Sequence, residues 1–179
     1  KNNQNIAGVD VQFVVEGPQD IGYHEFESEV PIIKDLLSEI DDTDVFFDIG
    51  ANIGLYSCVI SQKIDSKNVA AFEPSPSPYK KLQKNSKFNG HFHHHQVAIS
   101  DTDEMVEFSV DVNDPHSRMS TINTDSSATD YQVREVTSRK LSSVVKNEDI
   151  PLPTIVKVDV EGAEFKVLKG MDELLDSIQ

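Results

Sequence analysis

The sequence predicts an α/β fold in which a mostly parallel sheet carries helices on both faces. Three apolar runs, at 44–50, 68–74 and 154–160, show almost no polar alternation, as expected of strands that are covered on both sides. Strand-like and helix-like segments alternate along the chain, and a glycine-containing turn comes after the first run. Alternation of this kind favours parallel strands joined by crossover helices.

The elements of the predicted sheet can be assigned in chain order. The run DVFFDIG gives the first strand, NVAAFEP the second, HFHHHQVAIS at 91–100 the third and TIVKVDV the fourth. Helices are expected at 52–64, at 75–90 with prolines in its first turn, and at 162–178 with an interruption at Gly170.

Residues 1–43 are expected to flank this core, which would occupy 44–179. They contain a strand at 9–17 and a helix at 28–40, which Ser28 could cap and in which Pro31 fits the first turn.

A longer piece at 101–153 separates the third and fourth strands. It holds two strand-like runs, at 105–110 and 131–141, which predict an inserted β-hairpin. Ligands of such sheets bind at the carboxyl ends of the strands. An insertion that leaves from one of these ends is well placed to cover a site.

Composition narrows the function classes. The 179 residues suffice for one domain with a core. A net charge of −15, from 31 acidic against 16 basic residues, disfavours nucleic acid and anionic membranes as partners. With no apolar run approaching ~20 residues and no leader-like start, we expect a cytoplasmic protein without a membrane span. The single Cys58 excludes an internal disulfide and a multi-cysteine zinc site.

The turn in VFFDIGANIG, at 45–54, predicts a nucleoside-binding site. Glycine lets the backbone approach a ligand closely, and Glu73 comes 23 residues after Gly50, where nucleotide folds place the acid that binds ribose hydroxyls. Asn52 stands where a dinucleotide site would have glycine, and Asp48 would repel a pyrophosphate. S-adenosylmethionine, which is cationic and lacks phosphate, fits these features. An NAD-dependent oxidoreductase and a non-catalytic cofactor-binding protein remain the alternatives.

Four segments carry a family resemblance: FFDIGANIGLYS, AAFEPSPSPYKKLQKN, VAISD and IVKVDVEGAEFKVLKG. In this order they resemble the signature segments of the FkbM family of S-adenosylmethionine-dependent methyltransferases, over about residues 45 to 170. The resemblance implies a Rossmann-like class I methyltransferase fold. It also implies O-methylation of a hydroxyl on a carbohydrate, a glycolipid, a lipid-linked sugar or another small metabolite. Such sheets have seven strands, so the resemblance further implies that C-terminal strands are missing.

The resemblance also assigns the site residue by residue. The methionine part of the cofactor would lie against Asp48, Gly50, Asn52 and Gly54, the ribose against Glu73, and the adenine against Gln96, Val97 and Ala98. Asp159 and Glu161 would face the transferred methyl group, and Lys157 joins them as a candidate catalytic residue because of its position in the strand and not through the resemblance.

Lys157 stands out because it lies inside an otherwise apolar strand, on the same face as Asp159. A buried ammonium is costly without a partner, so we expect a nearby carboxylate to pair with it. Asp159 and Glu161 could together help to hold a magnesium or calcium ion. The metal-free interpretation is favoured, and no residue is assigned as a metal ligand.

Overall fold

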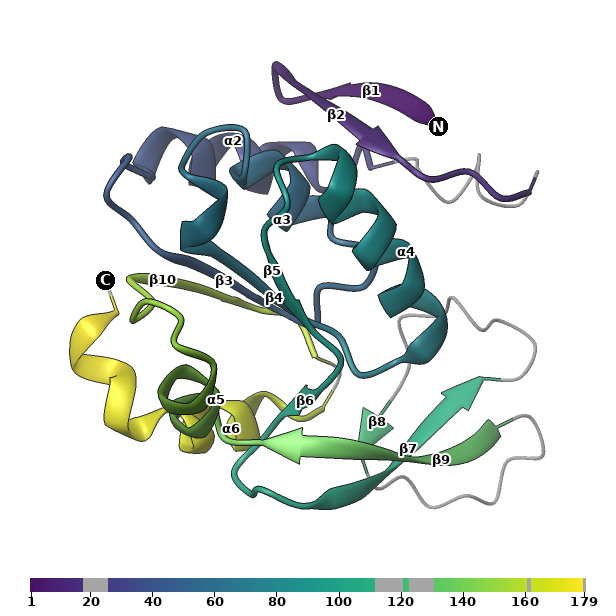
Figure 1. Ribbon diagram of the computed structural model, residues 1–179, viewed down its shortest axis with the longest axis vertical. Helices are drawn as coiled ribbons and strands as arrows, with labels where there is room; N and C mark the ends of the chain where they lie inside the picture. The colour runs from purple at the N-terminus through teal and green to yellow at the C-terminus, as the bar shows by residue number, and fades with distance from the viewer. Residues whose placement is uncertain (18–25, 112–120, 123–130, 161, 179) are drawn as a thin grey trace.

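A four-stranded parallel sheet forms the centre of the protein. The computed structural model describes residues 1–17, 26–111, 121–122, 131–160 and 162–178. The strand order is β10-β3-β4-β5, and each neighbouring pair is parallel (Figure 1). The strands are β3 (Phe46–Ile49), β4 (Val69–Phe72), β5 (His93–His95) and β10 (Ile155–Val158). The predicted parallel sheet is confirmed.

Both faces of this sheet are buried, which explains the apolar runs. On one face, Phe46, Val69 and Ala71 belong to one apolar cluster. On the other face, Phe47 and Phe72 belong to a second cluster, and their ring centroids lie 5.4 Å apart. Side chains on a strand point alternately to its two sides, so a strand between two helical layers needs apolar residues at nearly every position.

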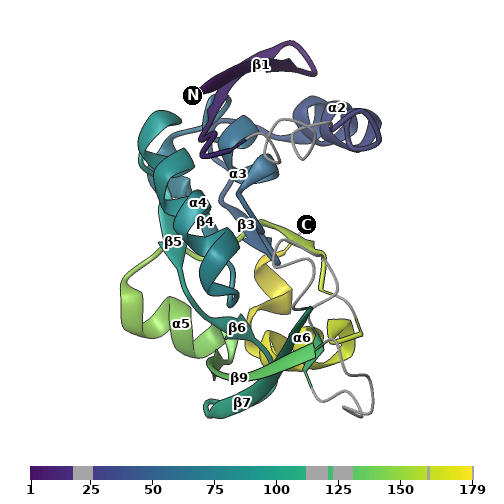
Figure 2. The same ribbon diagram turned by 90° about the vertical axis from the view of Figure 1, so that its right-hand side faces the viewer.

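Helices cover the two faces in separate groups (Figures 1 and 2). The first cluster includes residues of the helices on one face: α2 (Val30–Glu39), α3 (Leu55–Ile60) and α4 (Pro76–Phe88). The second includes residues of the elements on the other face: α5 (Leu141–Glu148), α6 (Glu164–Gly170) and the 3₁₀ helix η2 (Asp172–Ser177). A short 3₁₀ turn, η1 (Ser66–Asn68), leads into β4. No helix within the described residues combines the length and the apolar character that crossing a membrane requires.

Two local expectations are wrong. The single strand over 91–100 is two strands, because after β5 the chain leaves the central sheet and forms β6 (Ala98–Ile99) in another one. The cap at Ser28 is also displaced: α2 begins after Glu29, whose side chain makes no capping hydrogen bond, although a proline does lie in the first turn.

The second sheet has the order β6-β9-β7-β8. β7 (Met105–Asp111) pairs antiparallel with both β9 (Tyr131–Arg139) and β8 (Thr121–Ile122), and β6 pairs parallel with β9. Most of the chain between β7 and β9 lies outside the described residues, so the predicted inserted hairpin stays a prediction.

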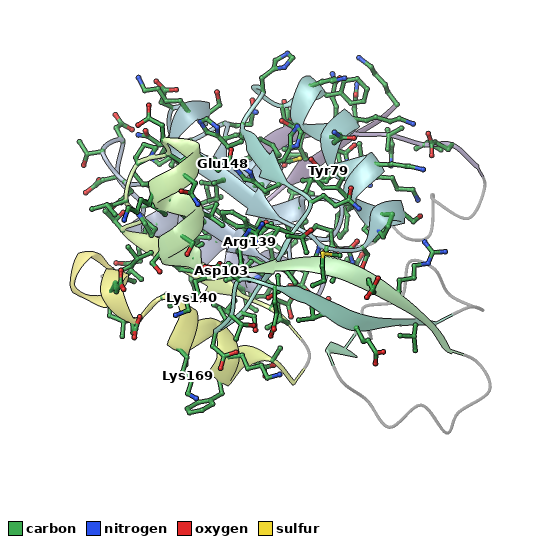
Figure 3. The ribbon with its side chains drawn as sticks, turned by 60° about the horizontal axis from the view of Figure 1, so that its bottom comes forward. Tyr79, Asp103, Arg139, Lys140, Glu148 and Lys169 are labelled. Carbon is green, nitrogen blue, oxygen red and sulfur yellow. The ribbon has the colours of Figure 1, made fainter. Side chains whose placement is uncertain are left out.

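Helix α5, within the predicted insertion, was not expected from the sequence. It begins where the carboxylate of Asp103 accepts hydrogen bonds from the backbone N–H of Lys140, at 2.8 Å, and from the Ser143 hydroxyl, at 2.7 Å. In Figure 3, Asp103, Arg139 and Lys140 lie together at this point, whereas Tyr79 lies apart on α4. Because the carboxylate at the start of α5 comes from Asp103, 37 residues before Lys140, the sequence around Lys140 contains no local signal for the start of a helix.

An N-terminal hairpin of β1 (Asn2–Ile6) and β2 (Val9–Phe13) packs on α3 and α4. The hairpin is held by two buried asparagines, Asn85 within α4 and Asn89 at the C-terminal end of α4. Asn89 Oδ1 accepts a hydrogen bond from Gln12 N at 3.0 Å, and Asn89 Nδ2 donates to Gln12 O at 2.8 Å. Asn85 accepts one from Val14 N at 2.8 Å and donates to Ile53 O at 2.9 Å. The amide of Asn89 thus pairs with the edge of β2 as a neighbouring strand would.

We predict that Asn89→Ala lowers the free energy of unfolding by about 3 kcal/mol, because it leaves two backbone groups of Gln12 without their partner. Asn5→Ala is the matched control in the same hairpin. Its amide is exposed and donates a hydrogen bond to Asp10, and its removal should cost no more than about 0.5 kcal/mol. Urea unfolding measures both, and equal effects would contradict the role given to Asn89.

Candidate functional site

The glycine turn after β3 is tied to the end of β4. The backbone N–H groups of Gly50 and Ala51 both donate to Phe72 O, at 3.0 Å each. The N–H of Asn52 donates to Glu73 Oε2 at 2.9 Å. The turn and the acidic residue that the sequence placed in one site are therefore in direct contact.

Left-handed backbone conformations shape the turn. Gly50 has φ +76°, Asn52 +53° and Gly54 +86°. Asparagine tolerates this region better than most side chains, because its short polar group can bond locally. This conformation accounts for an asparagine at a position where a dinucleotide site would have glycine.

Gly50 is required by a close approach within the chain. A Cβ atom added there would lie 2.0 Å from the backbone oxygen of Asp159, and one added at Gly54 would lie 2.5 Å from Leu82 Cδ1. The backbone of Asp159, at the end of β10, is therefore packed directly against the turn at Gly50. The approach that needs glycine at position 50 is one between two chain segments, whatever ligand the turn receives.

Glu73 is buried, and its two carboxylate oxygens are bound by different segments. Oε1 accepts a hydrogen bond from Ser75 N at 2.7 Å, and Oε2 accepts the one from Asn52. Burial raises the pKa of Glu73 above its ordinary value, and these N–H donors offset part of that rise. The Ser75 side chain also hydrogen-bonds to this carboxylate, so Ser75 and Asn52 together occupy part of its accepting capacity of about four hydrogen bonds.

Lys157 lies at the junction of β10 and β3, where its register partner is Asp48. Its Nζ lies 3.0 Å from Asp48 Oδ1, 3.2 Å from Gly50 O and 3.4 Å from Asp159 Oδ2. The predicted pairing with a carboxylate is confirmed. Burial lowers the pKa of Lys157, but the carboxylates of Asp48 and Asp159 raise it by more, so its pKa lies above the ordinary value. The side chain is therefore a permanent cation at neutral pH.

Asp48 is fully buried and engaged by the protein. Beside the Lys157 contact, its Oδ2 accepts hydrogen bonds from the Ser57 hydroxyl at 2.7 Å and from Ser57 N at 3.3 Å. The side chain of Asp159, by contrast, is 65% exposed. Asp159 is thus the solvent-accessible carboxylate of this cluster, while Asp48 is buried and fully enclosed by the protein.

The sequence analysis missed two residues of this cluster, Tyr56 and Glu29. The ring centroid of Tyr56 lies 5.0 Å from Lys157 Nζ, and the Tyr56 hydroxyl donates a hydrogen bond to Glu29 Oε2 at 2.8 Å. Burial, together with the smaller effect of the hydrogen bond to Glu29, raises the pKa of Tyr56. The available signal was the pair of polar residues, Tyr56 and Ser57, at the start of a helix that is otherwise apolar and buried.

The residues assigned to adenine lie at the same edge but in different environments. Gln96 is exposed, and its Nε2 lies 3.5 Å from Pro74 O, close to Glu73 in the chain. Val97 and Ala98 are buried in separate apolar clusters, so their side chains are used in packing. Glu161 lies outside the described residues. No three His, Cys, Asp or Glu side chains in the described part of the chain are grouped to hold a metal ion.

Fold and edge together define the class of the protein. A parallel sheet covered by helices, with a glycine turn against an acidic residue at its carboxyl edge, is consistent with a Rossmann-like α/β domain. Residues 48–179 match the family model described as the methyltransferase FkbM domain. The chain therefore belongs to the FkbM methyltransferase family, and the resemblance noted in its sequence is confirmed. Membership implies S-adenosylmethionine as the methyl donor.

Individual relatives agree with this family. The chain is 32% identical over 178 residues to the hexuronic acid methyltransferase AglP of Haloferax volcanii, with 97% of this chain and 69% of the relative covered. It is 23% identical to Methyltransferase 1 of Beauveria bassiana and 26% identical to Methyltransferase sdnD of Sordaria araneosa. Those two alignments cover 76% of this chain and 64% of each relative. The chain thus spans about two thirds of the length of the relatives it matches.

We predict that Gly50→Ala lowers the free energy of unfolding by about 3 kcal/mol or more, because it adds a backbone clash to a left-handed conformation. Gly8→Ala is the control: Gly8 has φ +89° and nothing within 4 Å of an added Cβ, so it should cost only about 1–2 kcal/mol. Chemical denaturation compares the two variants. Equal losses would show that Asp159 can move away without cost.

Glu73 predicts a dependence of stability on pH. Since its pKa is raised in the folded state, the folded protein holds this proton more tightly than the unfolded chain. Folding is therefore favoured below the ordinary value of about 4.3 and loses that contribution as pH rises through the folded pKa. Glu73→Gln removes the titration. The stability of the variant relative to the wild type should increase between about pH 4 and pH 7, and a flat or falling difference would contradict the raised pKa.

Proposed function

We propose that this domain transfers the methyl group of S-adenosylmethionine to a hydroxyl of a sugar. The observation that carries the proposal is the arrangement of the carboxyl edge in a member of a methyltransferase family. Glu73 faces the glycine turn at the end of β4, and the exposed carboxylate of Asp159 stands beside the same turn at the end of β10.

The chemistry of this edge fits the proposed cofactor. The carboxylate of Glu73, which Ser75 and Asn52 hold beside the turn, would accept hydrogen bonds from the two hydroxyls of a ribose with its remaining accepting capacity. Within the described residues of the edge, the ammonium of Lys157 already contacts three oxygens, which leaves it poorly placed to neutralise a pyrophosphate. A cationic nucleoside is therefore favoured over a dinucleotide such as NAD.

The remaining assignments rest on position. The turn residues Asp48, Gly50, Asn52 and Gly54 would lie along the methionine part. Gln96, Val97 and Ala98 would border the adenine, the latter two through their backbone because their side chains are buried. Bound S-adenosylmethionine supplies an electrophilic methyl group on a sulfonium centre.

Asp159 is proposed to orient the acceptor hydroxyl and to accept its proton as the oxygen is methylated. Its exposure makes it accessible, and the Lys157 ammonium 3.4 Å away restrains its carboxylate. Lys157 itself stays protonated, so its part is electrostatic and positional. Glu161 keeps its assignment near the methyl group as a prediction from the sequence.

The acceptor is proposed to be a sugar because one relative is a hexuronic acid methyltransferase. In this chain we place the reaction at a hydroxyl. An acceptor carboxylate at the methyl end would approach the exposed carboxylate of Asp159, and the ammonium of Lys157 is already shared between Asp48 and Asp159. Repulsion between the acceptor carboxylate and the carboxylate of Asp159 disfavours a carboxylate as the nucleophile.

The test is a transfer assay with S-adenosylmethionine labelled in its methyl group, offered neutral sugars, hexuronic acids, and glycan and lipid-linked sugar extracts. We expect labelled product whose label survives mild alkali, as a methyl ether does. Label released by alkali would identify a methyl ester and contradict the hydroxyl assignment. Absence of transfer to every acceptor would contradict the proposed function.

We predict that Asp159→Asn lowers turnover by about 10²-fold or more, because the amide cannot accept the hydroxyl proton. Affinity for S-adenosylhomocysteine, measured by calorimetry, should change little, since Glu73 and the turn are untouched. Asp35→Asn, an exposed position on α2, is the control for removing one negative charge. Normal turnover in Asp159→Asn would remove Asp159 from the catalytic step.

A further inference from the structure

The ammonium of Lys157 is enclosed on one side by oxygens and on another by an aromatic ring. Its Nζ lies 3.0–3.4 Å from oxygens of Asp48, Gly50 and Asp159, and it donates a hydrogen bond to Gly50 O. The centroid of the Tyr56 ring lies 5.0 Å from Nζ, within the range of a cation–π interaction. The ring therefore limits how far the ammonium can withdraw from its three oxygens.

The ring is itself held in place from outside the strand. Tyr56 is only 7% exposed, and its hydroxyl donates to Glu29 Oε2 at 2.8 Å. Glu29 is the residue from which α2 begins. A chain of contacts thus runs from α2 through the first turn of α3 to the ammonium at the end of β10.

From this geometry we propose that Tyr56 and Glu29 are positioning residues for methyl transfer, acting through Lys157 on the carboxylate of Asp159. The inference rests on the proposed function for its kinetic consequence and on the contacts alone for its structural part. Neither residue is placed against the cofactor or the acceptor.

The weakest of the three ammonium contacts decides what a loosened Lys157 would change. Nζ lies 3.0 Å from Asp48, which is fully buried and also bonded by Ser57, but 3.4 Å from Asp159, whose side chain is 65% exposed. Without the ring, the ammonium can shift while keeping Asp48, and Asp159 loses its restraint. The defect should therefore appear in the transfer step, because the contacts of Glu73 with the turn do not involve Tyr56.

Kinetics separate this role from simple support of the fold. Loss of a desolvated cation–π contact corresponds to about a tenfold change, so Tyr56→Leu should lower kcat about tenfold with little change in the KM for S-adenosylmethionine. Tyr56→Phe keeps the ring and should retain at least about a third of the turnover. Phe88→Leu is the matched control, because the Phe88 ring lies 4.0 Å beneath another ammonium, that of Lys1, at the far end of α4. It should leave both constants unchanged.

A second readout does not depend on activity. In protein carrying ¹³C-labelled lysine, the Hε protons of Lys157 should show an upfield ring-current shift. Tyr56→Phe keeps the ring but loses its hydrogen bond to Glu29, so it should reduce this shift to the same extent as Glu29→Ala, whereas Tyr56→Leu should abolish it. Glu29→Ala should reduce it, while Glu29→Gln, which retains an acceptor, should restore most of it.

The inference would be overturned by a Lys157 shift that is the same in all four variants as in the wild type, or by a folded Tyr56→Leu protein with the kcat of the wild type. A fall in S-adenosylhomocysteine affinity as large as the fall in kcat would also overturn it, because Tyr56 would then act on the cofactor. If the wild type transferred methyl to no acceptor, the proposed function would fail, and the shifts would still decide whether Tyr56 and Glu29 position Lys157.

Discussion

The buried ammonium of Lys157 is the interaction on which the architecture of the carboxyl edge depends. It joins β10 to the end of β3, and these segments are far apart in the chain because 107 residues separate Lys157 from Gly50. Asp48 is fully buried beside it, and removing Lys157 would leave this carboxylate without a cationic partner in the core, which is strongly destabilising. Once this pair is formed, the ends of β3 and β10 are fixed against each other.

The shape of the turn depends on that constraint. With β10 held against β3, the backbone oxygen of Asp159 lies where a side chain at position 50 would be, so the turn requires glycine. The turn then closes on β4 through Phe72 and Glu73. Among the described residues of this edge, the carboxylates of Asp48, Glu73 and Asp159 outnumber the ammonium of Lys157, and this balance supports the proposal of a cationic nucleoside over a phosphate-bearing one.

Patterns within short segments allowed the sequence to predict the covered strands, the helices after them and the need of Lys157 for a carboxylate. The identity of the partner depended on the register of β10 against β3, which no local pattern contains. The break after His95 was missed because Ala98 and Ile99 continue an apolar run while pairing with a different strand. The hydrogen bond of Tyr56 to Glu29, the cap of α5 by Asp103 and the pairing of Asn89 with β2 all join distant segments. Strand β1 was missed because its residues, NNQNI, are polar on both faces.

The central claim is that this edge binds an adenosine whose 5′ substituent carries an ammonium group, and not a dinucleotide whose 5′ substituent is a pyrophosphate. Calorimetric titration of the wild-type protein with S-adenosylhomocysteine and, separately, with NAD tests it most directly, because both ligands contain adenosine but differ in the group attached to its 5′ carbon. The account predicts measurable binding of S-adenosylhomocysteine and none of NAD at the same concentrations. Binding of NAD without binding of S-adenosylhomocysteine would contradict it.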